Sequence, residues 1–195
     1  METAAFHTLL KRYGMFFVGL VIMSFGIACS IKAELGTSPV SSLPFVLSQF
    51  TPLSVGIASV LVNATLILLQ ILLLRRQYDP IQLIQLPVAL AFGFLTDFSV
   101  WVLQDITCSS YLTQWMLCIC GILLVGIGVS FEVTANVVTL AGEGMVLAIC
   151  KVFPVKFANA KVGMDLTLVT TAAVLSLLFL GTLVGVREGT VAAAI

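Results

Sequence analysis

A series of long apolar runs, separated by short polar segments, is the feature that most constrains what this chain can fold into. The runs cover residues 14–31, 53–74, 84–103, 115–133 and 162–184. About 20 apolar residues are needed for a helix to span the hydrocarbon core of a bilayer. Inside that core each backbone polar group must be satisfied within its own segment. The pattern therefore predicts an all-α, polytopic transmembrane helical bundle that forms a single membrane domain over residues 1–195.

The composition supports this interpretation and excludes several classes of function. The chain is 60% hydrophobic and only 9% charged, whereas soluble domains carry about 25% charged residues. Nine Lys and Arg residues balance nine Asp and Glu residues without a long basic run, so nucleic acid is not an expected partner. Its only histidine is His7, and no catalytic or metal-binding motif is present. We therefore expect no enzyme activity, no metal and no cofactor, with membrane lipid as a partner.

The distribution of basic residues predicts the orientation of the chain. If the amino terminus is cytoplasmic, seven of the nine Lys and Arg residues fall on the cytoplasmic side and only Lys32 and Arg187 fall outside. This bias follows the positive-inside rule. A sixth apolar run begins at Thr190 and is cut off at Ile195, which we interpret as a truncated last span.

The two halves of the sequence resemble each other. A shift of 102 positions aligns residues 17–74 with residues 119–176 without a gap. The identities include Gly19 with Gly121, Gly26 with Gly128, Ala33 with Ala135, Thr37 with Thr139 and Pro52 with Pro154. Three spans per unit, over residues 14–104 and 115–195, would make the second unit enter the membrane from the opposite face. We therefore predict an inverted repeat; a duplicated bundle without a transport role is the alternative.

In each expected unit, an amphipathic segment of about a dozen residues follows the first span. The first covers residues 41–50 and is preceded by Ser38 and Pro39, a combination typical of a helix amino terminus. Its counterpart begins at residues 142–144 and runs to about Val152. Both segments are too short to cross a bilayer. They predict broken, half-membrane or interfacial helices.

Two motifs resemble those of a known group. The segment 26–39, which ends in Lys32-Ala33-Glu34-Leu35-Gly36-Thr37-Ser38-Pro39, resembles the first-span signature of the YczE/YitT-type bacterial multi-pass membrane proteins. The segment from Gly93 to Asp97 resembles that group's third-span pattern of glycine followed by an acidic residue. The resemblance implies a protein of the bacterial cytoplasmic (inner) membrane with five or six spans. The biochemical role of that group is largely unassigned.

Polar residues within the apolar runs are the candidate site. Asp97 lies about one turn from the centre of the third run, without Lys or Arg at helical spacing. A carboxyl at that depth is costly and suits proton binding and release; a hydrogen-bonded packing residue is the alternative. Lys161 and Asp165 stand four apart on one helix face and can pair. Their counterparts in the first half are Ser59 and Asn63.

Three further residues complete the candidate set. Glu132 and Asn136 share a helix face at the end of the fourth run. Asp97, Glu132 and Asp165 would converge if the bundle brings their helices together. Lys32 is a candidate for attracting an anion near the first short helix, with interfacial snorkelling as the alternative.

We hypothesise a small secondary transporter or permease that carries an unknown small solute, with proton coupling through these carboxyls. The midplane cavity would be lined by Asn63, Asp97, Glu132 and Asp165. The alternative is a membrane scaffold, assembly factor or regulatory component that does not transport. A third hypothesis is lipid handling by amphipathic segments lying in the interface. Gly-bearing faces on the first and fourth spans also suggest a homodimer.

Overall fold

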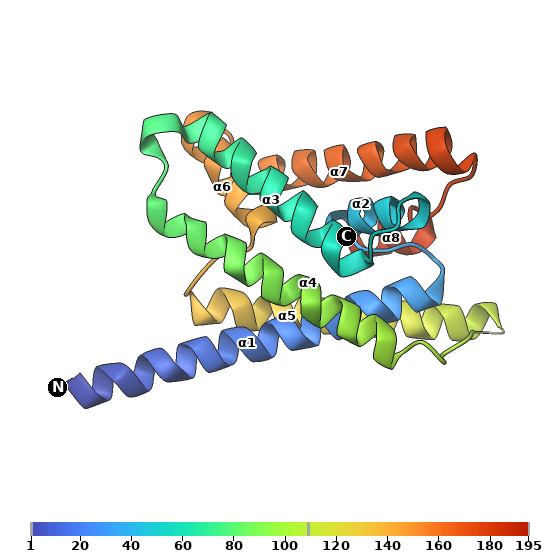
Figure 1. The fold of residues 1–195 in the computed structure, drawn as a ribbon, viewed down its shortest axis with the longest axis horizontal. Helices are drawn as coiled ribbons and strands as arrows, with labels where there is room; N and C mark the ends of the chain where they lie inside the picture. The colour runs from blue at the N-terminus through green and yellow to red at the C-terminus, as the bar shows by residue number, and fades with distance from the viewer. Residues whose placement is uncertain (1, 109, 195) are drawn as a thin grey trace.

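The computed structural model describes residues 2–108 and 110–194, and helices form all the regular structure in these ranges. Figure 1 shows α1, α4 and α5 along one side of the molecule and α7 along the other. In chain order the elements are α1 (Glu2–Ala33), α2 (Pro39–Phe50), α3 (Val55–Leu74), the 3-10 helices η1 (Arg75–Gln77) and η2 (Pro80–Ile84), α4 (Gln85–Val102), α5 (Tyr111–Ala135), α6 (Ala141–Val152), α7 (Phe157–Leu180) and α8 (Glu188–Ala194).

Five of the described helices are long and apolar enough to cross a membrane, as the sequence predicted. They are α1 from Leu9 onward, α3, α4, α5 and α7. The last one was expected over residues 162–184 but covers Phe157–Leu180. It ends at Leu180 because Gly181 adopts a left-handed conformation with φ 69° and terminates the helix. The last residue of the expected second unit, Ile195, lies outside the described residues.

The two short helices predicted between the spans are present. Both have 12 residues, and α2 begins with Ser38 at its N-cap and Pro39 at its first position. They lie in opposite halves of the molecule, α6 at the left and α2 at the right of Figure 1. Each buries five residues inside the bundle. They are therefore packed against other helices rather than lying freely on a membrane surface.

Each short helix runs alongside a long helix from the other half of the chain. At the end of α2, Phe50 stacks on Phe179 of α7 with ring centroids 4.6 Å apart. At the end of α6, Lys151 donates a hydrogen bond to the carbonyl of Gln77, just beyond α3. α6 starts 102 positions after α2, and α7 starts 102 positions after α3. The order and spacing of these elements therefore agree with the internal sequence repeat.

Helices α1 and α5 form the most extensive contact in the bundle and run antiparallel. A Cβ built on Gly19 would lie 2.9 Å from the carbonyl of Gly128, and one on Gly26 would lie 2.8 Å from the carbonyl of Gly121. Small residues let helix backbones approach in this way within a membrane. These four glycines are used within one chain, so a homodimer would have to use another face.

Asp97 of α4 forms two hydrogen bonds with the start of α3. Its Oδ2 accepts a 2.5 Å hydrogen bond from the hydroxyl of Ser54, and its Oδ1 accepts a 2.6 Å bond from the backbone N–H of Gly56. The first backbone N–H groups of a helix lack partners within that helix. The carboxylate of Asp97 is the acceptor for one of these N–H groups, that of Gly56 at the amino terminus of α3.

Replacement of Gly26 by alanine should weaken the contact between α1 and α5. The added Cβ would meet backbone atoms of Gly121 and Val125 at 2.8 Å, and such overpacking costs about 1–3 kcal/mol. Thermal unfolding of the detergent-solubilised protein would measure the loss. Gly126→Ala is the matched control, because nothing lies within 4 Å of a Cβ at that position. Equal stability of the two variants would contradict the packing described.

Replacement of Asp97 by alanine should lower the stability of the fold. Loss of the carboxylate leaves the partly buried N–H of Gly56 without its acceptor, at a cost of about 1–3 kcal/mol. Asp105→Ala is the control, because Asp105 is exposed in the connection between α4 and α5. Thermal unfolding in detergent is again the measurement. An Asp97→Ala variant as stable as the control would show that Asp97 does not act as a structural cap.

Candidate functional site

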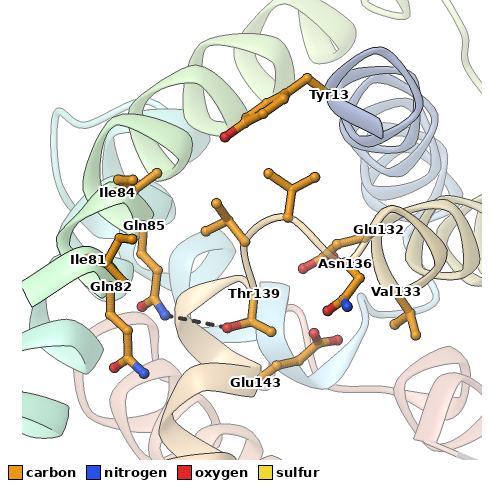
Figure 2. Close-up of a pocket in the computed structure, with 12 residues that line it drawn as sticks. Tyr13, Ile81, Gln82, Ile84, Gln85, Glu132, Val133, Asn136, Thr139 and Glu143 are labelled. Atoms are coloured by element: carbon orange, nitrogen blue, oxygen red, sulfur yellow. Dashed lines mark hydrogen bonds between the residues drawn. The ribbon is translucent and has the colours of Figure 1, made fainter. Parts of the chain in front are cut away.

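A cavity of about 350 Å³ lies where the end of α5, the start of α6 and the start of α4 meet α1. Figure 2 shows polar side chains of η2, α4, α5 and α6 around it, with Tyr13 of α1 across the opening. The lining residues are Tyr13, Ile81, Gln82, Ile84, Gln85, Glu132, Val133, Asn136, Val137, Val138, Thr139 and Glu143. Two of the predicted site residues, Glu132 and Asn136, are therefore part of one cavity.

Glu132 is the most deeply buried charged group at this cavity. Glu132 is only 2% exposed, and its Oε1 accepts a 2.9 Å hydrogen bond from the backbone N–H of Leu140. The other oxygen, Oε2, has no hydrogen-bond partner among the described residues. Its backbone packs next to Gly19, well inside the span of α1. An acceptor is thus available within the membrane.

Glu143 places a second carboxylate beside the first. It lies in the first turn of α6 and lines the same cavity. Figure 2 shows the side chains of Glu132, Asn136 and Glu143 directed toward a common space. Burial raises the pKa of the Glu143 carboxyl above its usual range, and the nearby ammonium of Lys161 acts in the opposite direction.

Glu143 also connects the cavity with the predicted pair on α7. Lys161 and Asp165 form the ion pair that their spacing predicted, with Nζ and Oδ1 2.7 Å apart. Both side chains are partly buried, at 33% and 20% exposure. Lys161 is close enough to Glu143 to affect it electrostatically. Glu143 of α6 is therefore an electrostatic neighbour of the ion pair on α7, and it lines the same cavity as Glu132 of α5.

A buried group of amides supports the wall of the cavity. Gln85 donates weakly to the hydroxyl of Thr139 at 3.5 Å, the bond drawn in Figure 2. Gln70, which is fully buried, donates a 2.9 Å bond to the carbonyl of Ala141. A Cβ on Gly144 would lie 2.7 Å from the side-chain nitrogen of Gln85. Glycine at position 144 therefore lets the two glutamine side chains lie against the first turn of α6.

A second cavity, of about 260 Å³, has nearly the same lining at the other end of α1. Of its 11 lining residues, eight stand 102 positions from a residue that lines the first cavity. The pairs are Ser30 and Glu132, Ile31 and Val133, Glu34 and Asn136, Gly36 and Val138, Thr37 and Thr139, Ile81 and Leu183, Gln82 and Val184, and Gln85 and Arg187. The internal repeat thus extends to the cavities.

The two cavities share backbone geometry but differ in charge. Glu34 and Asn136, which follow the ends of α1 and α5, both have left-handed φ angles, of 57° and 46°. Ser30 stands where the first cavity has Glu132, and Arg187 stands where it has Gln85. The hydroxyl of Thr37 is buried without a partner among the described residues. Only the first cavity therefore carries a buried carboxylate.

The structure does not bring the remaining predicted residues to the cavity of Glu132. Asp97 binds the amino terminus of α3, and the side chain of Asn63 donates to the carbonyl of Ser59 on its own helix. The ammonium of Lys32 donates to the carbonyl of Gln104, at 2.9 Å, in the connection after α4. The predicted convergence of Asp97 with Glu132 and Asp165 is therefore not the arrangement found.

The space between α3 and α7, where a polar midplane cavity was expected, is an apolar groove of about 730 Å³. Its described lining residues carry no charge, and hydroxyls of Thr65, Thr167 and Thr171 are its main polar groups. Asn63 and Asp165 are not among them. Asp165 instead lines a small cleft beside Pro39 and Thr190.

Sequence reasoning missed Glu143, Gln70 and Gln85. Glu143 was placed at the start of the second short helix without a role, although an acidic residue in the first turn of such a helix is itself a signal. The two glutamines lie 15 positions apart, on different helices, and meet only through the packing of α3 against the start of α4. No spacing rule would have paired them.

The first cavity suits the binding of a small polar solute or a proton. It offers two carboxylates and several neutral acceptors, with apolar walls from isoleucine and valine side chains. Pockets of this kind combine an apolar lining with a few polar groups that fix orientation. Among the described residues, no group of three or more His, Cys, Asp and Glu side chains could hold a metal ion.

Comparisons with known proteins agree with the membrane fold. The sequence model of a family of unknown function (DUF6198) matches residues 10–195. The chain is 31% identical over 118 residues to the uncharacterized protein YyaS of Bacillus subtilis, a match that covers 60% of this chain and 57% of YyaS. It is 26% identical over 165 residues to the uncharacterized membrane protein YczE of the same organism, covering 84% of this chain and 74% of YczE.

The matched region thus spans little more than half of YyaS. No solved structure matches the chain. The match to the family covers nearly all of the sequence and includes both cavities, and the motif from Gly26 to Pro39 lies within it. The chain is therefore a membrane protein that belongs to the DUF6198 family and is of the YczE type.

Proposed function

We propose that this protein is a small secondary transporter of the bacterial inner membrane, built as an inverted repeat. The observation that carries the proposal is the pair of cavities at opposite ends of α1 whose linings are related by the same shift of 102 positions. Transporters with inverted repeats expose a site alternately to the two sides of the membrane. Cavities at repeat-related positions, one at each end of α1, give such a mechanism an access path from each side.

The antiparallel contact of α1 with α5 supports the inverted arrangement. Gly19 meets Gly128 and Gly26 meets Gly121, whereas the sequence repeat equates Gly19 with Gly121 and Gly26 with Gly128. Such an exchange of partners is the signature of a two-fold axis between two like elements. An axis that relates antiparallel spans lies in the plane of the membrane, so one unit would be upside down relative to the other.

The short helices support a transport role as well. The start of α6 lies next to Glu132 of α5. The backbone of Glu132 packs beside Gly19, which is well inside the α1 span. Broken helices whose amino termini lie within the membrane form the solute sites of many transporters. One oxygen of Glu132 has no hydrogen-bond partner in the described part of the chain, and we assign this carboxyl the role of binding the solute or a coupling proton.

The proposed orientation has the amino terminus in the cytoplasm, with seven of nine Lys and Arg residues on that side. The cavity of Glu132, with Tyr13 at its opening, then faces the cytoplasm. The second cavity, which Thr37 lines, then faces the outside.

Accessibility labelling should distinguish the two faces. In a variant without the five native cysteines, Asn136→Cys and Glu34→Cys place one thiol at each cavity, at positions that are exposed. A membrane-impermeant maleimide should label Glu34→Cys from outside intact cells and label Asn136→Cys only in inside-out vesicles. Labelling of both positions from the same side would contradict the inverted repeat.

Transport should depend on Glu132. In proteoliposomes that contain a pH-sensitive dye, a panel of small amines, amino acids, carboxylates and sugars should include a solute whose addition changes the internal pH. Glu132→Gln should lower that rate by about tenfold or more, because the buried carboxylate is lost. Asp105→Asn is the control, because Asp105 is exposed and lines neither cavity. No response to any solute would favour the scaffold or regulatory role instead.

A further inference from the structure

The charge around the cavity of Glu132 is unbalanced. Glu132 and Glu143 both line it, and its described lining residues include no lysine or arginine. Lys161, whose ammonium acts electrostatically on Glu143, already forms a 2.7 Å ion pair with Asp165. Three carboxylates thus share one ammonium, so the site is short of positive charge.

Two buried hydrogen-bond acceptors at or near this site also lack donors among the described residues. Oε2 of Glu132 is an acceptor without a donor among the described residues, in a residue that is only 2% exposed. The side-chain oxygen of Gln70, just behind the cavity wall, also lacks a donor. Unpaired buried acceptors are costly. What the site lacks is a ligand with a positive charge and several N–H groups.

We propose that the cavity of Glu132 binds a small organic solute through a primary ammonium group. The proposal rests on the proposed function in taking this cavity as the solute site, and it names the chemical class of that solute. The ammonium donates to Oε2 of Glu132 and to the carboxylate of Glu143. Its three N–H groups leave one for the side-chain oxygen of Asn136.

The rest of the cavity limits the solute to a compact one with an apolar part. The volume of about 350 Å³ suits a molecule of amino-acid or short-amine size. Ile84, Val137 and Val138 provide apolar wall opposite the carboxylates. A metal cation is a poorer fit because the described residues offer no group of three ligands. An anion would face two carboxylates and no free cation.

Binding of butylamine to the purified full chain in detergent tests this proposal by isothermal titration calorimetry. Tetramethylammonium has the same charge without N–H groups, and butyrate has the opposite charge with an apolar tail one carbon shorter. Butylamine should bind about tenfold or more tightly than either. Glu132→Gln should weaken butylamine binding by about tenfold or more, whereas Asp105→Asn should leave it unchanged.

Asn136→Asp provides a test that does not rely on loss of function. Aspartate tolerates the left-handed conformation of this exposed position, and a third carboxylate should tighten butylamine binding several-fold. Equal affinity for butylamine, tetramethylammonium and butyrate would overturn the proposal, as would butylamine binding that is insensitive to both cavity variants. Butylamine binding without any solute-driven flux in proteoliposomes would reject the transport function and leave this inference standing. Flux of a solute that has no amine, with no butylamine binding, would do the reverse.

Discussion

The structure depends on a constraint that burial imposes on short helices. A helix whose amino terminus is buried in the bundle has backbone N–H groups without partners in the helix, and each must find an acceptor. Glu132 meets this need for α6 by accepting from the N–H of Leu140. The same carboxylate then holds its second oxygen at the cavity. Support of the fold and presentation of a binding group are therefore combined in one side chain.

The two halves of the chain have corresponding backbone features but different side chains at their cavities. The starts of α2 and α6, the starts of α3 and α7, and the left-handed residues Glu34 and Asn136 each stand 102 positions apart. At the position of Glu132, however, the first half has Ser30, and its cavity contains Arg187 instead of Gln85. The side chains that face the cavities are free to differ, so only one of the two sites is acidic.

The sequence was sufficient for the elements and much less so for the site. Apolar runs predicted the spans, and Ser38 with Pro39 marked the start of α2, because both signals are local. The position of Asp97 within its run also suggested a functional carboxyl, whereas the structure places it on the N–H of Gly56. That contact joins positions 41 apart. Only the way in which α3 packs on α4 reveals whether such a carboxylate is free or already satisfied.

The groove between α3 and α7 has a consequence for the mechanics of the molecule. It is apolar, about 730 Å³ in volume, and lined by residues of α2, α3, α6 and α7. In a bilayer, acyl chains are the material that fills such a space, and they exchange and rearrange far more easily than packed side chains. The separation of these two long helices is then set jointly by protein and lipid. Membrane thickness and acyl-chain order become variables that act directly on the shape of this protein.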